Sequence, residues 1–456
     1  MRHKSERAAR WTGLVGICIA SFLGCLDLTL INTMLPAIGQ QFAMPLGATQ
    51  WIASSFMVAL SAFMVPAGVL ADRLGRKKVL LFGLGLFGAA SVVAGLATQP
   101  GVLVAARFAQ GAACAALYTA AGAIVSYTFG AREQAKALGV LFGANGLGLA
   151  LGPVVGGCLA GALNWRWAFW VNVPLVAISA WLCAWFTMER RAACRRRIDA
   201  TGSLLLFVGL LLLVSGLSLD DQRLQWWLLA SAPLALGLFA RHEWNTPTPL
   251  MELHLFRNFT FCSASLATFF LAFTYCVVLL TLPMLLSSHF GKGEASIGWA
   301  LLPATMSFAL VSTWAGSSSE RFGPSMIVLC GLILLALACA LFIPAAGSGD
   351  VRWFLAPLVL FGTGWGAILG PTTLMALRVF SQEKAAVAMG TSWTVHNVGG
   401  ASGIAFATFV IRQSHDFRTG FQVLMGLLAA IVITLSGVHW GLHRGVARVA
   451  PDQARG

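Results

Sequence analysis

Two ionisable residues, Asp27 and Arg107, stand inside stretches of the sequence that are otherwise apolar. An ionisable side chain at the centre of a membrane helix costs roughly 2.5–3.5 kcal/mol or more, so each is a candidate for function. A nearby guanidinium favours an ionised carboxylate, whereas burial favours the protonated acid. A carboxyl group balanced between these influences could take up and release a proton, and this is the chemistry that the two residues predict.

Helical geometry places the two residues at similar depths. At 1.5 Å per residue, Asp27 lies roughly 13 Å from the outer end of its segment, and Arg107 roughly 8 Å from the outer end of its own. The pair is within reach if the two segments are neighbours. Gln110 and Gly111 follow Arg107 at i+3 and i+4 and therefore share its helical face. A carboxylate satisfied structurally by a neighbouring helix, or one in a wet vestibule, is the alternative for Asp27.

A second candidate is the stretch "GVLADRLGRKK" at 68–78, which gathers the charges that fall between Asp27 and Arg107: Asp72, Arg73, Arg76, Lys77 and Lys78. Its basic residues would hold a short loop in the cytoplasm. Gly68 and Gly75 predict close helix approach and a tight turn. Asp72 is placed where a carboxylate could meet a helix N-terminus or an Arg. Such a contact could latch one helix bundle to another in one conformation and release it in the next.

Glycines repeat at four-residue intervals in one apolar segment, where the small and helix-bending residues are Gly148, Gly152, Pro153, Gly156 and Gly157. Small residues at this spacing let two helices pack closely. Pro153 removes one backbone hydrogen bond and bends the helix. Ordinary tight packing is the alternative to a functional role, and the spacing alone favours neither.

Polar and aromatic residues inside other segments predict a cavity for an apolar substrate, lined by Asn32, Trp51, Gln110, Asn145, Trp393, His396 and Asn397. Aromatic residues at Phe273, Tyr275 and Trp365 could also line it. His396 would titrate near neutral pH if unperturbed. The alternatives are a hydrogen-bonded interior histidine beside Asn397, a substrate contact and a second proton site. Trp226, Trp227 and Trp353 lie at segment ends and fit an interfacial aromatic belt.

The composition is that of a membrane protein. Only 10% of the residues are charged and 58% are apolar, with a mean hydropathy of +0.80, whereas a soluble domain carries about 25% charged residues. The net charge of +14 falls in short clusters between apolar segments, which fits loops at anionic lipid headgroups rather than a nucleic-acid partner. The ten cysteines show no metal-ligand spacing. GxxxxGK[ST], HExxH and GxSxG are all absent, which disfavours an ATP-binding partner, a cofactor, a metal and an enzyme.

About 20 mainly apolar residues cross the hydrocarbon core, and the sequence predicts fourteen such spans: 13–36, 49–71, 79–98, 102–127, 136–161, 167–187, 200–219, 225–240, 259–286, 296–315, 325–346, 353–377, 385–411 and 421–442. The eighth is the weakest because it is short. The start of the chain imitates a signal peptide, but the apolar pattern resumes after Asp27 without a cleavage site, so a retained first helix is expected. With both termini cytoplasmic, the predicted inner loops and tails hold 23 Lys and Arg and the outer loops 6, as the positive-inside rule requires.

The longest polar connections divide this all-α membrane protein into six helices, two helices and six helices. The predicted parts are a cytoplasmic tail (1–12), a six-helix bundle (13–187), a linker with inserted helices 7–8 (188–240), a second linker (241–258), a second six-helix bundle (259–442) and a tail (443–456). "WAGSSSERFG" (314–323) echoes "GVLADRLG" (68–75), and "NVGGASG" (397–403) echoes "NGLGLALG" (145–152). Both echoes fall in corresponding helices of the two bundles, which indicates an internally repeated transporter.

The loop Gly68-x-Leu70-Ala71-Asp72-Arg73-x-Gly75-Arg76-Lys77 resembles the loop signature of the major facilitator superfamily. Further stretches resemble motifs of its drug:proton antiporters, in the expected order: "LDLTLINTMLP" (26–36), "RFAQG" (107–111) and "GLALGPVVGG" (148–157). Two more are similar to marks of the fourteen-helix branch: "WRWAFWVNVP" (165–174) and "RRRIDATG" (195–202). The resemblance covers nearly the whole chain but is thinner after residue 240, where "GWALLP" (298–303) and the degenerate loop repeat stand out. Related fourteen-helix exporters often carry an Arg at the place of His396.

The resemblance implies a secondary transporter that exchanges protons for an outward-moving organic compound by alternating access. It assigns proton coupling to Asp27 and Arg107, gating to the loop of Gly68, Asp72, Arg73, Gly75 and Arg76, and export and sealing to the glycine-rich helix. The expected partners are a small-molecule substrate, protons and membrane lipids, in the plasma membrane of a bacterium. An importer or uniporter of the same fold and, with less support, a non-transport membrane protein are the alternatives.

Overall fold

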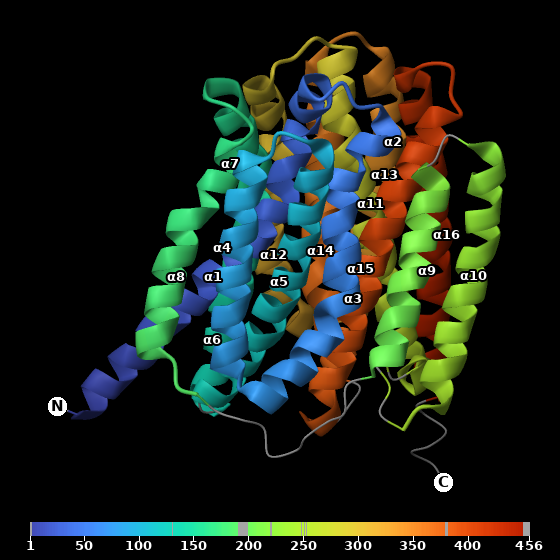
Figure 1. Ribbon diagram of the computed structural model, residues 1–456. Coiled ribbons are helices and arrows are strands. Elements are labelled where there is room, and N and C mark those ends of the chain that lie inside the picture. Colours follow the sequence, from blue (N-terminus) through green and yellow to red (C-terminus); the bar gives the residue numbers. More distant parts are fainter. Residues whose placement is uncertain are drawn as a thin grey trace. The chain divides into compact units, whose positions relative to one another are not determined.

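The computed structural model describes residues 2–129, 131–189, 199–218, 221–247, 249, 251, 253–378 and 382–449. In these residues every regular element is helical, and the long helices run side by side within each part of the molecule (Figure 1). The predicted all-α class is therefore confirmed.

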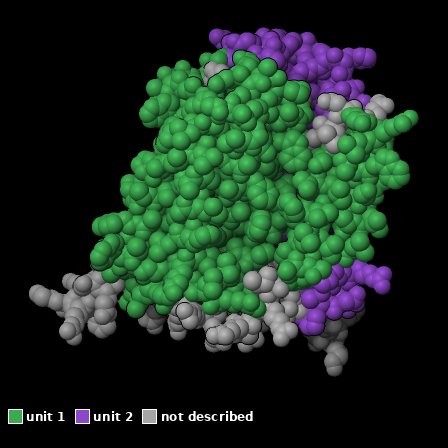
Figure 2. All heavy atoms as spheres, in the orientation of Figure 1, with its two compact units in different colours: residues 1–239, 293–299 green, residues 240–292, 300–456 purple. Residues whose placement is uncertain are grey.

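The described chain divides into two compact units, which Figure 2 colours separately. Unit 1 comprises residues Met1–Phe239 and Gly293–Trp299. Its helices are α1 (Arg2–Gln41), α2 (Leu46–Thr49), α3 (Trp51–Leu74), α4 (Arg76–Leu96), α5 (Pro100–Thr128), α6 (Ala131–Ala162), α7 (Trp167–Trp170), α8 (Asn172–Phe186), α9 (Ala200–Ser218) and most of α10 (Gln222–Asn245). Within it α1 packs against α6 and α8, and α5 packs against α3 and α4.

Unit 2 comprises Ala240–Lys292 and Ala300–Gly456. Its elements are η1 (Leu253–Arg257), α11 (Phe259–Ser288), most of α12 (Glu294–Phe322), α13 (Pro324–Gly347), η2 (Val351–Phe354), α14 (Leu355–Arg378), α15 (Gln382–Arg412) and α16 (Phe417–Val449). Here α11 packs against α15 and α14, and α13 packs against α14 and α16. Asn258 caps α11, since its Oδ1 accepts from the backbone N–H groups of Thr260 and Phe261 at 3.0 and 3.2 Å.

Eleven helices in the described residues are long and apolar enough to cross a membrane. Three more fall where the second, seventh and eighth spans are predicted: α3, α9 and α10. Large apolar side chains are exposed on the outer faces of the helices, among them Phe82, Trp185 and Leu238, as hydrocarbon surroundings allow. The protein is a multi-pass membrane protein, and the count of fourteen spans stays a prediction.

The two sequence echoes correspond to matching structural features in the two units. Gly75 ends α3 and begins α4 with φ +114°, and Gly323 stands between α12 and α13 with φ +80°. L-residues with a side chain rarely adopt such φ values, so glycine is needed at both turns. The glycines of the second echo lie on α6 and α15, which pack on α1 and α11 respectively. Each unit thus repeats one pattern of turn and helix packing.

Candidate functional site

Asp27 on α1 and Arg107 on α5 form a buried ion pair, in which Nη1 of Arg107 donates to Oδ2 of Asp27. The side chains are 1% and 0% exposed, so water does not screen the pair. The prediction that these two residues come within reach of one another is confirmed. An unpaired charge buried at this depth would cost several kcal/mol. The pairing of the two charges offsets this cost.

Further groups hold the guanidinium from three directions. Its Nε donates to the carbonyl of Ile52 on α3 at 3.1 Å, and its Nη1 also donates to Oε1 of Gln110 at 2.9 Å. The amide of Gln110 in turn donates to Ser91 on α4 at 2.9 Å. The ring of Phe56 lies 4.5 Å from the guanidinium carbon, a cation–π distance. Nη2 has no hydrogen-bond partner among the described residues.

Asn172 is the functional candidate that the sequence analysis missed. It opens α8 and is fully buried, and its Nδ2 donates to the second carboxylate oxygen of Asp27 at 3.0 Å. The other end of its amide, Oδ1, finds no partner in the described residues. Asn172 lies in the stretch "WRWAFWVNVP", which the sequence analysis used only for the family resemblance. Asn172 is a polar residue in an apolar run and lies in the outer half of its span, as Asp27 and Arg107 do. This shared depth could have identified it as their partner.

The network therefore joins five helices around one carboxyl group. A guanidinium and an amide both donate to this carboxyl group. Protonation would remove the negative charge that balances Arg107 and would leave a buried cation with neutral acceptors. The arrangement can thus convert proton uptake into a change of helix contacts.

The glycine repeat of α6 packs α1 into place. A Cβ at Gly152 would lie 1.9 Å from the hydroxyl oxygen of Thr29, and one at Gly148 would lie 2.6 Å from the carbonyl of Phe22. The Thr29 hydroxyl donates across this interface to the carbonyl of Leu149 at 3.2 Å. Gly156 is equally tight, with Thr33 at 2.4 Å from a built Cβ. The stripe therefore brings the backbone of α1, the helix that carries Asp27, close to the backbone of α6.

Helix α6 also contacts the beginning of α12 within unit 1. A Cβ built on Gly298 would lie 2.9 Å from the carbonyl of Pro153 and 3.1 Å from Cα of Gly157. Gly156 and Gly157 thus face different neighbours, α1 and α12. The prediction of close packing is confirmed on both faces, and whether this helix serves export stays a prediction.

The signature loop is clamped within unit 1 by a residue that the sequence analysis did not single out. The carboxylate of Glu189, just after α8, accepts from the backbone N–H groups of Lys77 and Lys78 at 3.3 and 3.2 Å. Nζ of Lys77 donates to the last carbonyls of α8, at Ala184 and Thr187, at 2.6 and 2.9 Å. An acid therefore meets the N-terminus of α4 and a base meets the C-terminus of α8, as the helix dipoles favour.

Other loop residues differ in their surroundings. A Cβ at Gly75 would lie 2.4 Å from Glu189, whereas one at Gly68 would meet Thr119 only at 3.7 Å, so the expected close approach at Gly68 is not required. Arg76 donates to the carbonyl of Ala123 at 3.3 Å. Arg73 is half-buried, and the side chain of Asp72 lies outside the described part of the chain. The predicted latch through Asp72 stays a prediction.

The residues predicted to line a substrate cavity do not form one set. Gln110 is 0% exposed and belongs to the Arg107 network, and Asn32 donates to the carbonyl of Leu28 one turn earlier at 3.3 Å. Trp51 and Asn145 are half-buried in unit 1, and Asn145 Oδ1 has no partner among the described residues. The remaining three are Trp393, His396 and Asn397, which lie together on α15 of unit 2.

His396 lies in an aromatic cluster of unit 2. Its Nδ1 is 3.0 Å from the hydroxyl of Thr268 and its Nε2 is 3.4 Å from the hydroxyl of Tyr275, both on α11. The Tyr275 ring stacks on Trp365 with centroids 4.7 Å apart and an angle of 8°. The hydrogen-bonded interior histidine is therefore the alternative that the geometry favours, and the expected aromatic grouping of Tyr275 and Trp365 is present.

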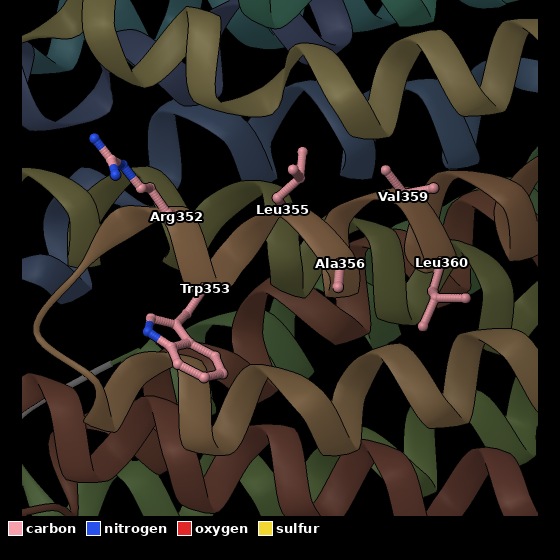
Figure 3. Close-up of a pocket in the computed structure, with 6 residues that line it drawn as sticks. All are labelled: Arg352, Trp353, Leu355, Ala356, Val359 and Leu360. Atoms are coloured by element: carbon pink, nitrogen blue, oxygen red, sulfur yellow. The ribbon is translucent and has the colours of Figure 1, made fainter.

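A groove of about 600 Å³ lies along η2 and the start of α14 and contains none of the predicted site residues. Figure 3 shows its six lining residues: Arg352, Trp353, Leu355, Ala356, Val359 and Leu360. Trp353, Leu355 and Val359 are exposed. An open apolar groove on a membrane-spanning helix suits lipid hydrocarbon rather than proton chemistry.

The sequence profile of the Major Facilitator Superfamily matches residues 17–404 and, in a second match, 264–442. The Multidrug resistance protein Stp of Mycobacterium tuberculosis (strain ATCC 25618 / H37Rv) is 31% identical over 401 residues, which cover 86% of this chain and 74% of that protein. The Lincomycin resistance protein of Streptomyces lincolnensis is 29% identical, over 94% of this chain and 91% of that protein. The Tetracenomycin C resistance and export protein of Streptomyces glaucescens is 29% identical, over 88% and 75%.

Solved structures show the same fold at low sequence identity. A mutant form of the nucleoside transporter NupG aligns with a TM-score of 0.68 and 14% identity over 94% of this chain and 99% of that chain. A bacterial homolog of the human lysosomal transporter Spinster aligns with a TM-score of 0.70 and 16% identity, over 96% and 97%. Both are transport proteins, and at these identities the likeness concerns the fold alone.

Proposed function

The chain belongs to the major facilitator superfamily, and from that premise we propose that it exports small organic compounds in exchange for protons. It is a transporter rather than an enzyme, and its relatives include multidrug and antibiotic resistance proteins. The observation that carries the proposal is the buried pair of Asp27 and Arg107, with Asn172 as the second partner of the carboxylate. Proton exchange requires one ionisable group that is stable in two states, and Asp27 has partners suited to the ionised one.

In the proposed cycle Asp27 is ionised while the guanidinium and the Asn172 amide donate to it. Proton uptake neutralises the carboxylate, and the charge of Arg107 then faces only Gln110 and the Ile52 carbonyl. Breaking a buried pair is unfavourable by about 3–5 kcal/mol. That free energy is available to shift the equilibrium between two conformations, provided that only one of them can reposition Arg107.

The transport cycle would follow alternating access, with two six-helix bundles (13–187 and 259–442) moving around a substrate site near the midplane. The seventh and eighth predicted spans, at α9 and α10, would be an insertion between the two bundles in the sequence. The loop at 68–78 would gate the cycle from the cytoplasm, and both termini would be cytoplasmic in a bacterial inner membrane. Export rather than import is supported by the resistance and export functions printed for the relatives.

The test is proton flux in proteoliposomes with an imposed pH gradient. The wild type is expected to couple movement of a lipophilic compound to proton movement in the opposite direction. Asp27→Asn keeps the size of the side chain and one acceptor oxygen but cannot titrate, and it is expected to abolish that coupling. Asp416→Asn is the matched control, because Asp416 lies between α15 and α16 and caps α16 through the Thr419 N–H at 3.0 Å.

Proton-coupled flux that persists unchanged in Asp27→Asn would move the proton site elsewhere and contradict the assignment. Substrate flux without any proton movement in the wild type would make the protein a uniporter. Loss of flux in Asp416→Asn as well would point to general damage, and a gel-filtration profile and melting temperature for each variant separate that case.

A further inference from the structure

We propose that the exported compound is a planar, uncharged aromatic molecule with a carbonyl or ether oxygen, and that Trp393 and Asn397 on α15 receive it. The inference rests on the proposed function and adds the chemistry of the substrate. It is carried by unit 2 alone, through the aromatic cluster, an unpaired amide donor, and the chemistry of the buried polar side chains.

The aromatic side chains of unit 2 form a continuous array across four helices. Successive ring centroids are 4.5 Å apart from Phe308 to Trp365, 4.7 Å from Trp365 to Tyr275, 5.7 Å from Tyr275 to His396, and 5.2 Å from His396 to Trp393. These are the separations of interacting rings. The array is fully buried at Phe308 and half-buried at Trp393. Trp393 is therefore the end at which another ring can be added.

Asn397 follows Trp393 at i+4 and His396 follows it at i+3, so the three side chains share one face of α15. Asn397 is 2% exposed, and its Nδ2 has no hydrogen-bond partner among the described residues. Buried donors are nearly always paired, so the unpaired donor of Asn397, one helical turn from Trp393, calls for an acceptor from outside the chain. An oxygen on a stacked ring would supply it.

The charge of the substrate follows from the other buried polar groups of unit 2. Among its described residues the single buried carboxylate is that of Glu243 on α10, and it already accepts from the Met251 N–H at 2.6 Å. The other buried polar side chains of this unit are Ser, Thr, Asn and His. Both ring nitrogens of His396 have hydroxyl neighbours. A cation at Trp393 would lose water and gain a ring face but no carboxylate, whereas an uncharged ligand avoids this desolvation penalty.

The experiment measures equilibrium binding to the purified full-length protein, with no pH gradient. The neutral probe is 1,8-dihydroxyanthraquinone, a planar molecule with carbonyl oxygens, and the cationic probe is ethidium, which is planar and has no carbonyl. The wild type is expected to bind the anthraquinone at least tenfold more tightly than ethidium. Asn397→Leu is expected to weaken anthraquinone binding about tenfold and to leave ethidium unchanged. Trp393→Leu should weaken the anthraquinone further, whereas Trp353→Leu, at the exposed groove of Figure 3, should not.

The binding results test the substrate class, and they do so independently of the test for proton exchange. Equal or tighter binding of ethidium, or no binding of either probe, would overturn the substrate class, as would unchanged anthraquinone affinity in both Asn397→Leu and Trp393→Leu. Asp27→Asn serves as the second measurement, because it removes the proton site while leaving the array in place, so it should still bind the anthraquinone while lacking proton coupling. Normal binding of the anthraquinone by a wild type that moves no protons would refute antiport and leave the substrate class standing.

Discussion

The two units share a packing pattern but differ in what they bury. Gly148 and Gly152 of α6 approach the backbone of Phe22 and Leu26 on α1, and Gly399 and Gly403 of α15 approach that of Phe269 and Phe273 on α11. Asp27 follows Leu26, the second of the two contact residues on α1, and Thr274 follows Phe273, the second contact residue on α11. Thr274 of unit 2 therefore corresponds to Asp27 of unit 1. The acid of one unit is thus a hydroxyl in the other.

The partner of the acid is replaced in the same way. A Cβ on Gly83 would lie 3.2 Å from the Ala113 carbonyl, and one on Gly331 would lie 3.1 Å from the Gly364 carbonyl. Six residues before these carbonyls stand Arg107 in unit 1 and Leu358 in unit 2. One helix framework therefore holds a charged network in one unit and an apolar, aromatic interior in the other. The difference fits the proposed division of labour, in which unit 1 handles the proton and unit 2 the substrate.

The largest effect is expected from making unit 1 resemble unit 2. Arg107→Leu leaves Asp27 buried without its partner and should destabilise the protein by about 3–5 kcal/mol. The double variant Asp27→Thr with Arg107→Leu removes both charges and should recover most of that stability without recovering transport. Melting temperatures of the purified variants measure the first effect, and proton-coupled flux measures the second. A double variant as unstable as Arg107→Leu would show that the two residues are not an energetic pair.

Asn172→Leu isolates the second partner of Asp27. A hydrogen bond to a charged group contributes about 1.5–3 kcal/mol. Its loss should therefore slow proton-coupled flux about tenfold or more. Asn172→Gln, which retains an amide, should lose less. An equal loss of flux in Asn172→Gln and Asn172→Leu would reduce Asn172 to a packing residue.

Gly152→Ala tests the packing that positions Asp27. The new Cβ would lie 1.9 Å from the Thr29 hydroxyl and 2.9 Å from the Leu26 carbonyl, so α1 and α6 must separate, at a cost of about 1–3 kcal/mol. Transport should fall with stability. Gly68→Ala is the matched control, because its nearest atom is 3.7 Å from the built Cβ and its effect should be within about 0.5 kcal/mol. Equal losses in the two variants would contradict the packing argument.

The smallest expected difference in stability is between variants of the two turn glycines, one in each unit. Gly75→Ala and Gly323→Ala both force a side chain into positive φ, at about 1–3 kcal/mol. Gly75→Ala also displaces Glu189 from the N-terminus of α4, and losing a helix cap costs about 0.5–2 kcal/mol more. Nothing lies within 4 Å of a Cβ at Gly323. Thermal unfolding should therefore rank Gly75→Ala below Gly323→Ala, and the reverse order would refute the cap.

Sequence alone predicted the helical membrane class and the approach of Asp27 to Arg107, because hydropathy and depth follow from composition and helical rise. It also located the repeat, because glycines at helix junctions and interfaces leave a readable pattern. Asn172 and Glu189 were missed because their roles depend on which helices become neighbours. His396 could not be assigned from sequence, since its hydroxyl partners on α11 lie more than 120 residues away.

The most direct test of the division of labour is proton release when substrate binds to the purified protein in weakly buffered solution. The account predicts that the wild type releases protons on adding 1,8-dihydroxyanthraquinone, that Asp27→Asn binds the probe without release, and that Trp393→Leu loses both together. Proton release that persists in Asp27→Asn, or binding that disappears with Asp27 and survives in Trp393→Leu, would contradict the assignment of the proton to unit 1 and the substrate to unit 2.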